Sequence, residues 1–244
     1  KIVSNEPTSV WTGQSEATVG NDSLYALGFA VGGPVLKNDP EQLTFRFSIN
    51  SLNQDGFRKN QFFTKDDTNE RDELTSRLRV RWLPNEFWSF ETGLLYADAD
   101  NGYDEFTLNN EAENTYSDKP GRDEQKTRGV SLKTKFNGMD RVELTYTGQF
   151  IDTDSLYRYD ADWGIGFGTA PPLGSGYSGV TQIEREREVS SHEFRLDSKD
   201  KTDALSFIDR WTIGLYHGQL DEQTLAQYLN GDSPDNAAVT SEYE

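Results

Sequence analysis

The stretch LTFRFSI, residues 43–49, decides the fold class of this chain. Four apolar side chains in it alternate with three polar ones. Successive side chains of a β-strand point to opposite faces, so this pattern predicts a strand with one apolar and one polar face.

The same alternation recurs along the chain, whereas helical periodicity is nearly absent. It recurs at 74–82, 88–96, 130–136, 142–150 and 211–215, and more weakly at 11–19, 25–31 and 190–198. We therefore predict about nine antiparallel strands of roughly ten residues, the length of a tilted strand that crosses a bilayer. The alternation predicts one face with Phe45, Val80, Leu94, Leu132, Leu144 and Ile213, and the other with Arg46, Arg79, Lys133 and Thr145.

Composition narrows the class of protein. Only 34% of the 244 residues are hydrophobic, although aromatic residues make up 12%. Soluble globular proteins are usually nearer half apolar, and disordered chains are poor in aromatic residues. A barrel in lipid fits better, because alternate residues face a polar lumen and long loops face water.

Charge and cysteine content exclude other classes. The formal net charge of -18 argues against a nucleic-acid partner, which requires a basic surface. The chain has no cysteine, so it has neither a disulfide framework nor a cysteine-based metal site.

The connections between the predicted strands alternate in length. Short ones at 37–41, 84–86 and 138–140 alternate with long ones at 56–71, 98–128 and 154–186. Short turns at one rim and long loops at the other are typical of outer-membrane barrels, with the long loops extracellular. The first hairpin, around 20–22, is an exception because its outer turn is short.

Several segments, in this order and spacing, resemble TonB-dependent outer-membrane receptors. They are GFAVGGPVL at 28–36, LTFRF at 43–47, DGFRKN at 55–60, YDADW at 159–163 and SHEFRL at 191–196. The resemblance implies an all-β fold, a partial antiparallel transmembrane β-barrel from a larger barrel of roughly 22 strands. It implies that residues 1–8 leave a plug domain and that 9–244 form barrel, incomplete after a final stretch, 241–244, that we expect to be a loop.

The resemblance also implies function. We expect energy-coupled uptake of a large scarce nutrient, such as a ferric siderophore, haem, cobalamin or a glycan, across the outer membrane of a Gram-negative bacterium. The expected partners are outer-membrane lipid, the nutrient, and the TonB complex acting through the plug region. Two alternatives stay open: a passive porin or substrate-specific diffusion channel, and a soluble extracellular β-sandwich or solenoid that binds carbohydrate.

Nothing in the sequence favours catalysis, a cofactor or a metal site. The two histidines, His192 and His217, have no nucleophile at a recognisable spacing. The acidic stretch 98–104 lacks the spacing and the closing glutamate of an EF-hand loop. We therefore expect a protein that is not an enzyme.

Two groups of side chains are candidates for function. Aromatic residues in the third and fourth predicted outer loops are expected to form part of the ligand's first contact surface, or else to pack these loops on each other: Tyr103, Phe106, Tyr116, Tyr157, Tyr159 and Trp163. Cations on the polar face should point into the lumen, because a charge facing lipid costs several kcal/mol: Arg46, Arg77, Arg79, Arg81, Lys133 and Lys135. These cations either hold a plug or an anionic ligand, or simply line a solvated wall.

Overall fold

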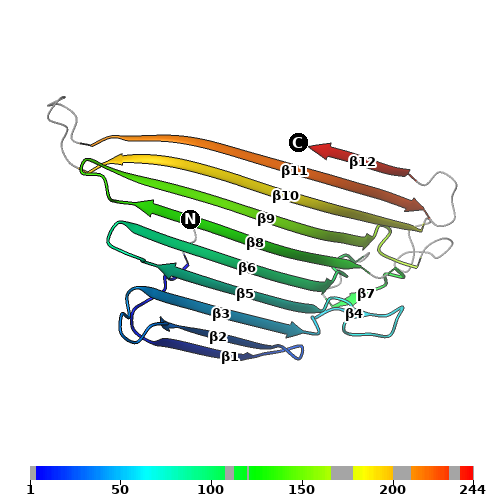
Figure 1. The fold of residues 1–244 in the computed structure, drawn as a ribbon. Helices are drawn as coiled ribbons and strands as arrows, with labels where there is room; N and C mark the ends of the chain where they lie inside the picture. The colour runs from blue at the N-terminus through cyan, green and yellow to red at the C-terminus, as the bar shows by residue number, and fades with distance from the viewer. Residues whose placement is uncertain are drawn as a thin grey trace.

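A computed structural model describes residues 4–107, 113–119, 121–165, 178–199, 210–230 and 237–243. Ten strands form one antiparallel sheet, and each strand pairs with its neighbours in sequence order (Figure 1). They are β1 (Thr12–Val19), β2 (Tyr25–Pro34), β3 (Leu43–Gln54), β5 (Arg71–Trp82), β6 (Trp88–Gly102), β8 (Arg122–Phe136), β9 (Val142–Asp160), β10 (Gly179–Ser198), β11 (Thr212–Asn230) and β12 (Ala237–Tyr243). Two short parallel strands, β4 (Lys59–Asn60) and β7 (Asn114–Thr115), join the long connections that follow β3 and β6.

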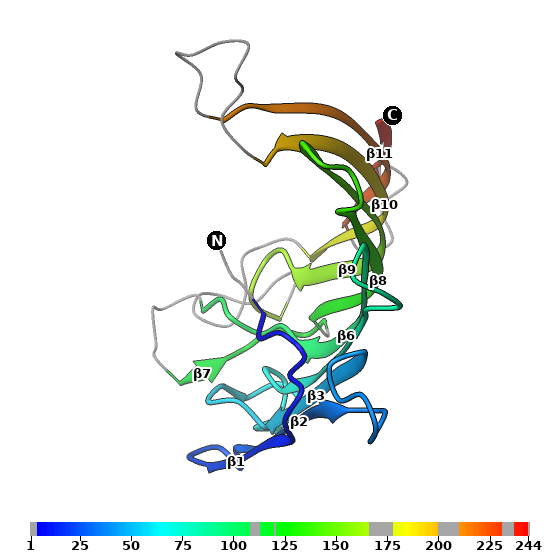
Figure 2. The same cartoon turned by 60° about the vertical axis from the view of Figure 1, so that its left-hand side comes forward.

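The main sheet curves into a trough, with β1 at one edge and β12 at the other (Figure 2). This arrangement confirms the prediction of a partial antiparallel barrel. About nine strands were predicted, and in the described residues the main sheet has ten. No helix in the described ranges is long and apolar enough to cross a bilayer.

The register of β3 and β5 fixes which residues share a face. Phe45 lies opposite Val80, and Arg46 lies opposite Arg79. Directly opposed residues of an antiparallel pair project on the same side of the sheet, so the apolar and cationic sets are separated as predicted. On the apolar side, large side chains are strongly exposed, and Leu94 and Ile213 have 47% and 65% of their surface accessible.

The N-terminal segment identifies the cationic face as the concave one. It runs across the inside of the trough before entering β1 (Figure 2). There, Arg79 Nη1 donates hydrogen bonds to the backbone oxygens of Ser4 at 3.0 Å and Asn5 at 2.9 Å. The polar face is therefore concave and the apolar face is convex.

Aromatic rings gather on the convex face beside the turn between β5 and β6. The ring of Phe90 stacks on Trp82, with centroids 5.4 Å apart, and on Trp88 at 5.6 Å. Trp88 also contacts Phe136 at 4.6 Å. Rings with an apolar body and a polar edge are favoured at the level of lipid headgroups.

The strands reach further than alternation predicts. Residues 98–128 and 154–186 were predicted to be loops, yet β6 pairs with β8 up to Gly102 and Arg122, and β9 pairs with β10 up to Asp160 and Val180. Beyond Phe150 the convex face of β9 carries Asp152 and Asp154 where apolar residues stood before, and only Leu156 interrupts this polar run. The alternation of apolar and polar residues disappears where the strands extend from lipid into water, although the backbone hydrogen bonds between the strands continue.

The prediction of a loop at 241–244 also fails. Residues 237–243 form β12, paired with β11 from Tyr228 opposite Ala237 to Glu222 opposite Tyr243, whereas we expected a loop at 241–244. This strand is short and lies beside the polar extension of β11, so it carries no apolar alternation. Residues 1–3, 244 and part of the predicted fourth outer loop, 166–177, lie outside the described residues.

Candidate ligand-binding site

Five of the six predicted aromatic residues lie together at the end of the sheet that carries the long connections, which we call the outer end. Tyr103 follows β6 directly, and its ring lies 4.9 Å from that of Tyr157 and 6.4 Å from that of Tyr159. Phe106 contacts Tyr159 at 6.1 Å and stacks on Trp163 at 4.8 Å with an interplanar angle of 18°. We call these five residues the aromatic cluster. The sixth, Tyr116, lies just after β7 and is not part of it.

The aromatic cluster lies at the mouth of the concave face. Tyr157 and Tyr159 belong to β9, not to a loop as predicted. The odd-numbered residues of β9 share the face of Thr147, which pairs with Lys133 of the concave face. Trp163 and Phe106 keep 37% and 39% of their surface exposed, so a molecule in the mouth can contact both rings.

Tyr157, one of the three tyrosines of the cluster, is a neutral hydrogen-bonding group. Burial, followed by a hydrogen bond to Tyr103, raises the pKa of Tyr157 above its ordinary value of 10.0. A phenol that keeps its proton combines a large contact area with a polar tip, which suits an aromatic or amphipathic ligand.

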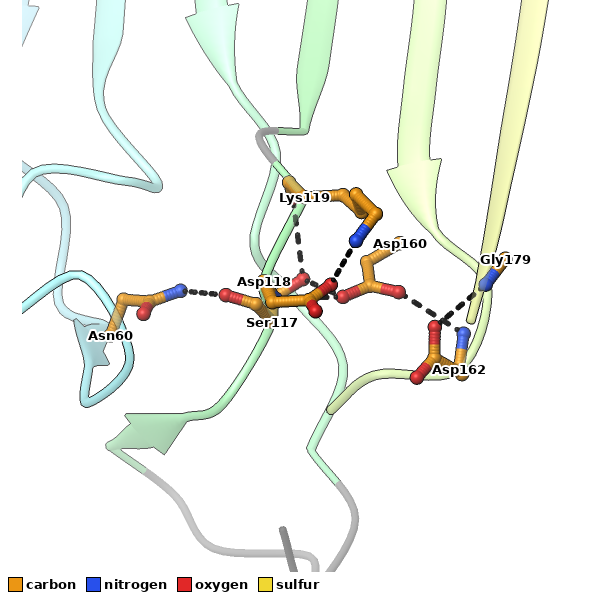
Figure 3. A network of polar contacts seen from close by, with 7 residues as sticks. All are labelled: Asn60, Ser117, Asp118, Lys119, Asp160, Asp162 and Gly179. Carbon is orange, nitrogen blue, oxygen red and sulfur yellow. Dashed lines mark hydrogen bonds and ion pairs between the residues drawn. The ribbon is translucent and has the colours of Figure 1, made fainter. Parts of the chain in front are cut away.

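A buried polar network ties the connections that hold this cluster (Figure 3). Asn60 Nδ2 donates to Asp104 Oδ2 and to the backbone oxygen of Ser117, each at 2.9 Å. Asp104 Oδ2 also accepts from Thr115 Oγ1 at 2.6 Å and from Thr68 Oγ1 at 2.7 Å. The connection after β3 is thereby fixed to the connection after β6.

The network continues to the end of β9. Ser117 Oγ donates to Asp160 Oδ2 at 2.8 Å, and the backbone N–H of Asp118 donates to the same oxygen at 3.0 Å. The backbone N–H of Asp162 donates to Asp160 Oδ1 at 3.2 Å, and Asp162 Oδ1 accepts from the backbone N–H of Gly179 at 3.0 Å. We call Asn60, Asp104, Ser117, Asp160 and Asp162 the loop clamp.

Sequence reasoning missed the loop clamp. Asn, Asp and Ser in predicted loops favour local turns, and nothing in their spacing indicates that Asn60 and Asp104 meet across 44 positions of the chain.

The six predicted cations all lie on the concave face, since Arg81 and Lys133 both pair with Glu91, and Lys135 with Thr145. Some are partly neutralised: Arg79 lies 3.3 Å from Glu91 and Lys135 lies 3.2 Å from Glu143.

A cavity of about 600 Å³ lies between these cations and the N-terminal segment. Its lining includes Ser4, Arg77, Glu91, Lys133 and Gln149. Arg77 also hydrogen-bonds the Ser4 hydroxyl, so the N-terminal segment forms one wall of this polar space.

The two histidines considered for catalysis lie elsewhere. His192 and His217 oppose each other on the convex face, where His192 Nδ1 lies 2.9 Å from the Tyr146 hydroxyl. In the described part of the chain, no three histidine, aspartate or glutamate residues are grouped in a way that could hold a metal ion.

An apolar convex face, a polar concave face and antiparallel neighbours define the wall of a membrane β-barrel. Solved structures with a similar fold include an uptake receptor and a receptor of the outer membrane. The ferric yersiniabactin uptake receptor FyuA from Yersinia pestis matches 98% of the chain at 16% identity, with a TM-score of 0.75. FpvAI in its complex with pyocin S2 matches 97% at 16% identity, with a TM-score of 0.64. The ferripyoverdine receptor of the outer membrane of Pseudomonas aeruginosa matches 97% at 15% identity, with a TM-score of 0.52.

The chain covers 35%, 30% and 31% of these three proteins, so it spans about a third of their length. At the level of the fold, the resemblance to the barrel of TonB-dependent receptors is confirmed. FyuA and the ferripyoverdine receptor are both receptors. No protein-family model and no curated protein sequence matches the chain.

Proposed function

We propose that this chain is part of the barrel of a TonB-dependent receptor in the outer membrane of a Gram-negative bacterium, and that the receptor imports a ferric siderophore. In this proposal residues 1–8 leave the plug domain, and residues 9–244 form the first part of the barrel wall. The outer end faces the medium, and the TonB complex acts through the plug.

The aromatic cluster is the observation that best supports a ferric siderophore as the substrate. Two stacked and partly exposed rings, Phe106 and Trp163, lie beside three tyrosines at the mouth of the concave face. Such a surface suits a large, flat or amphipathic ligand better than a small hydrated solute. The proteins of the same fold named above include receptors for ferric yersiniabactin and ferripyoverdine, which supports the same class.

The course of the N-terminal segment favours a receptor over a passive porin. This segment enters β1 from inside the trough, where Arg77 and Arg79 hydrogen-bond Ser4 and Asn5. A plug domain preceding such a segment would already lie in the lumen. The cations Arg46, Arg81, Lys133 and Lys135 then line the space that the plug occupies.

The convex face disfavours the soluble alternative. Its large apolar side chains, Leu94, Leu132 and Ile213 among them, are exposed over several neighbouring strands. A soluble β-sandwich covers such a face with a second sheet, whereas lipid covers it in a barrel.

Radioiron uptake tests the proposal. The full-length receptor is expressed in a Gram-negative host that lacks siderophore synthesis and its own siderophore receptors, with and without TonB. Catecholate, hydroxamate and mixed-ligand siderophores loaded with radioiron are offered. Saturable, TonB-dependent uptake of at least one class is expected. Uptake that is non-saturable and independent of TonB would indicate a passive channel, and a complete lack of ferric siderophore uptake would contradict the substrate class.

A further inference from the structure

Two segments of chain carry the aromatic cluster, and they are held in different ways. Tyr157 and Tyr159 belong to β9, whose backbone pairs with β10 beside both residues. Residues 103–107 follow β6 and belong to no strand, so no ladder of backbone hydrogen bonds fixes Tyr103 and Phe106. The position of these two rings therefore depends on other contacts of the segment 103–107.

Asp104, which follows Tyr103, ties this segment to its surroundings. Its side chain lies in a residue that is only 5% exposed. Its Oδ2 atom accepts three hydrogen bonds, from Asn60 Nδ2 at 2.9 Å, Thr68 Oγ1 at 2.7 Å and Thr115 Oγ1 at 2.6 Å. A buried carboxylate that loses such donors is destabilised. The carboxylate therefore holds the segment against the connection after β3 and against β7.

Asn60 can make these contacts in one orientation only. It is 2% exposed, and its Nδ2 atom donates to Asp104 and to the backbone oxygen of Ser117 (Figure 3). Its Oδ1 atom accepts from the backbone N–H groups of Phe62 at 3.0 Å and Phe63 at 2.9 Å. A reversed amide would place its oxygen against two acceptors. The connection after β3 thus presents a fixed donor to Asp104.

The same network reaches the strand that carries the other tyrosines. Ser117 Oγ donates to Asp160 Oδ2 at 2.8 Å, and Asp160 is the last residue of β9, directly after Tyr159. Asn60 contacts both Asp104 and Ser117, so it links the segment 103–107 to the end of β9.

Glu105 adds two contacts with the same connection. Its backbone oxygen accepts from Arg58 Nη2 at 2.8 Å, and its Oε1 atom accepts from Asn69 Nδ2 at 2.7 Å. The segment between Tyr103 and Phe106 is therefore held at consecutive residues by the connection after β3. Order that exists before a ligand binds lowers the entropic cost of binding.

We propose that Asn60 and Asp104 are positioning residues for ligand binding, which hold Tyr103 and Phe106 beside β9 so that the aromatic cluster is assembled before a ligand arrives. Both residues are buried, so they act through the rings and not by contact with the ligand. The effect on binding rests on the proposed function, whereas the ordering of 103–107 does not.

A spin label on Thr107→Cys, one residue beyond Phe106, tests the ordering without any ligand. The label is attached to the full-length receptor in detergent micelles, with all other cysteines replaced by serine. Its electron paramagnetic resonance spectrum should show restricted motion when Asn60 is present. Motion should be several-fold faster in Asn60→Ala, because Asp104 then loses a donor and Phe62 and Phe63 lose their acceptor.

A milder variant and a control accompany this change. Thr68→Val removes one hydroxyl donor to Asp104 but keeps the size of the side chain, so it should increase the motion less than Asn60→Ala does. It also tests the inference if Asn60→Ala gives no heat-modifiable band. The control is Gln61→Ala, which removes an exposed hydrogen bond of 2.7 Å to Asn114 beside Asn60 and should leave the label restricted.

Ligand binding shows whether the ordering acts through the rings. The radioiron-loaded siderophore taken up best in the panel above is titrated against each receptor. The dissociation constant should rise several-fold in Asn60→Ala, less in Thr68→Val, and not in Gln61→Ala. When Tyr103 and Phe106 are both replaced by alanine, Asn60→Ala should have no further effect, because residues that act through one another are not additive. A role in folding alone would reduce binding equally in both backgrounds.

Three results would overturn the inference: a label equally restricted in Asn60→Ala and Thr68→Val, a mobile label with unchanged affinity, or an equal loss of affinity with and without the two rings. The first concerns the ordering alone. It is therefore distinct from failure of the proposed function, which would appear as an absence of siderophore uptake.

Discussion

Trp163 stacks on Phe106 at the edge of the aromatic cluster, and both rings remain partly open to solvent. The backbone of Trp163 is in the left-handed region, with a φ of 59°. Such a conformation is uncommon for a large non-glycine residue and is found where the surrounding structure holds it. The connection after β9 therefore holds Trp163 in place, with its ring partly exposed at the mouth of the concave face.

Replacing this ring gives a residue-scale prediction. Trp163→Ala should weaken binding of the transported ferric siderophore by about tenfold or more, because aromatic anchors dominate the free energy of many binding sites. Equilibrium binding of the radioiron-loaded siderophore to purified receptor measures the effect.

The matched control for this change is Phe62→Ala. Phe62 is an exposed aromatic residue of the connection after β3, and its ring packs on Phe63 outside the aromatic cluster. Equal losses of affinity in the two variants would show that the aromatic cluster has no special role.

At the scale of the elements, alternation predicts the strands only where their two faces meet different media. The alternation of Phe45 and Arg46 predicts β3, because the first side chain faces the apolar side of the sheet and the second faces the lumen. Further along, Asp152 and Thr153 of β9 are both polar, so the sequence carries no periodic signal although the ladder continues to Asp160.

The sequence also predicted only part of the candidate site. Aromatic residues of the predicted outer loops were proposed as a ligand surface, and five of the six lie together in the structure. The loop clamp was not predictable, because contacts such as Asn60 to Asp104 depend on how two connections cross in space. The sequence alone does not distinguish a polar residue that is buried in the structure from one that is exposed to solvent.

A proline at Ser155 tests the extended strand. Alternation predicts a loop here, whereas the structure pairs Ser155 with Gln125 of β8 and Arg185 of β10. Proline removes a ladder hydrogen bond and is tolerated poorly in a central strand. Ser155→Pro should therefore lower the deuterium protection of 155–165 and weaken siderophore binding, while the receptor still reaches the outer membrane.

Ser155→Val serves as the control, because a β-branched residue suits a strand. It should keep both protection and binding. If Ser155→Pro behaved like Ser155→Val, residues 154–160 would form a loop.

At the scale of the whole molecule, the described sheet is open. The strands β1 and β12 each pair on one side only. An unpaired edge within lipid leaves backbone groups without hydrogen-bond partners, which costs several kcal/mol for each group.

Residues 1–244 expressed alone should therefore fail to form a closed barrel. The expected result is no heat-modifiable, protease-resistant band after refolding into micelles. The full-length receptor, refolded in the same way, is the control and should give that band. Recovery of a stable monomer from the segment would mean that its two edges can be satisfied without further strands.

The central claim is that this chain forms a transmembrane wall with its long connections outside the cell and its short turns in the periplasm. Residues 1–244 contain no cysteine, so single cysteines are introduced here in a full-length receptor whose other cysteines are replaced by serine, and they are labelled with a membrane-impermeant maleimide. Gln61→Cys lies in the long connection after β3, and Asn85→Cys lies in the short turn between β5 and β6. We predict that Gln61→Cys is labelled in intact cells and that Asn85→Cys is labelled only after the outer membrane is permeabilised. Labelling of Asn85→Cys in intact cells, with Gln61→Cys protected or equally labelled, would contradict the account.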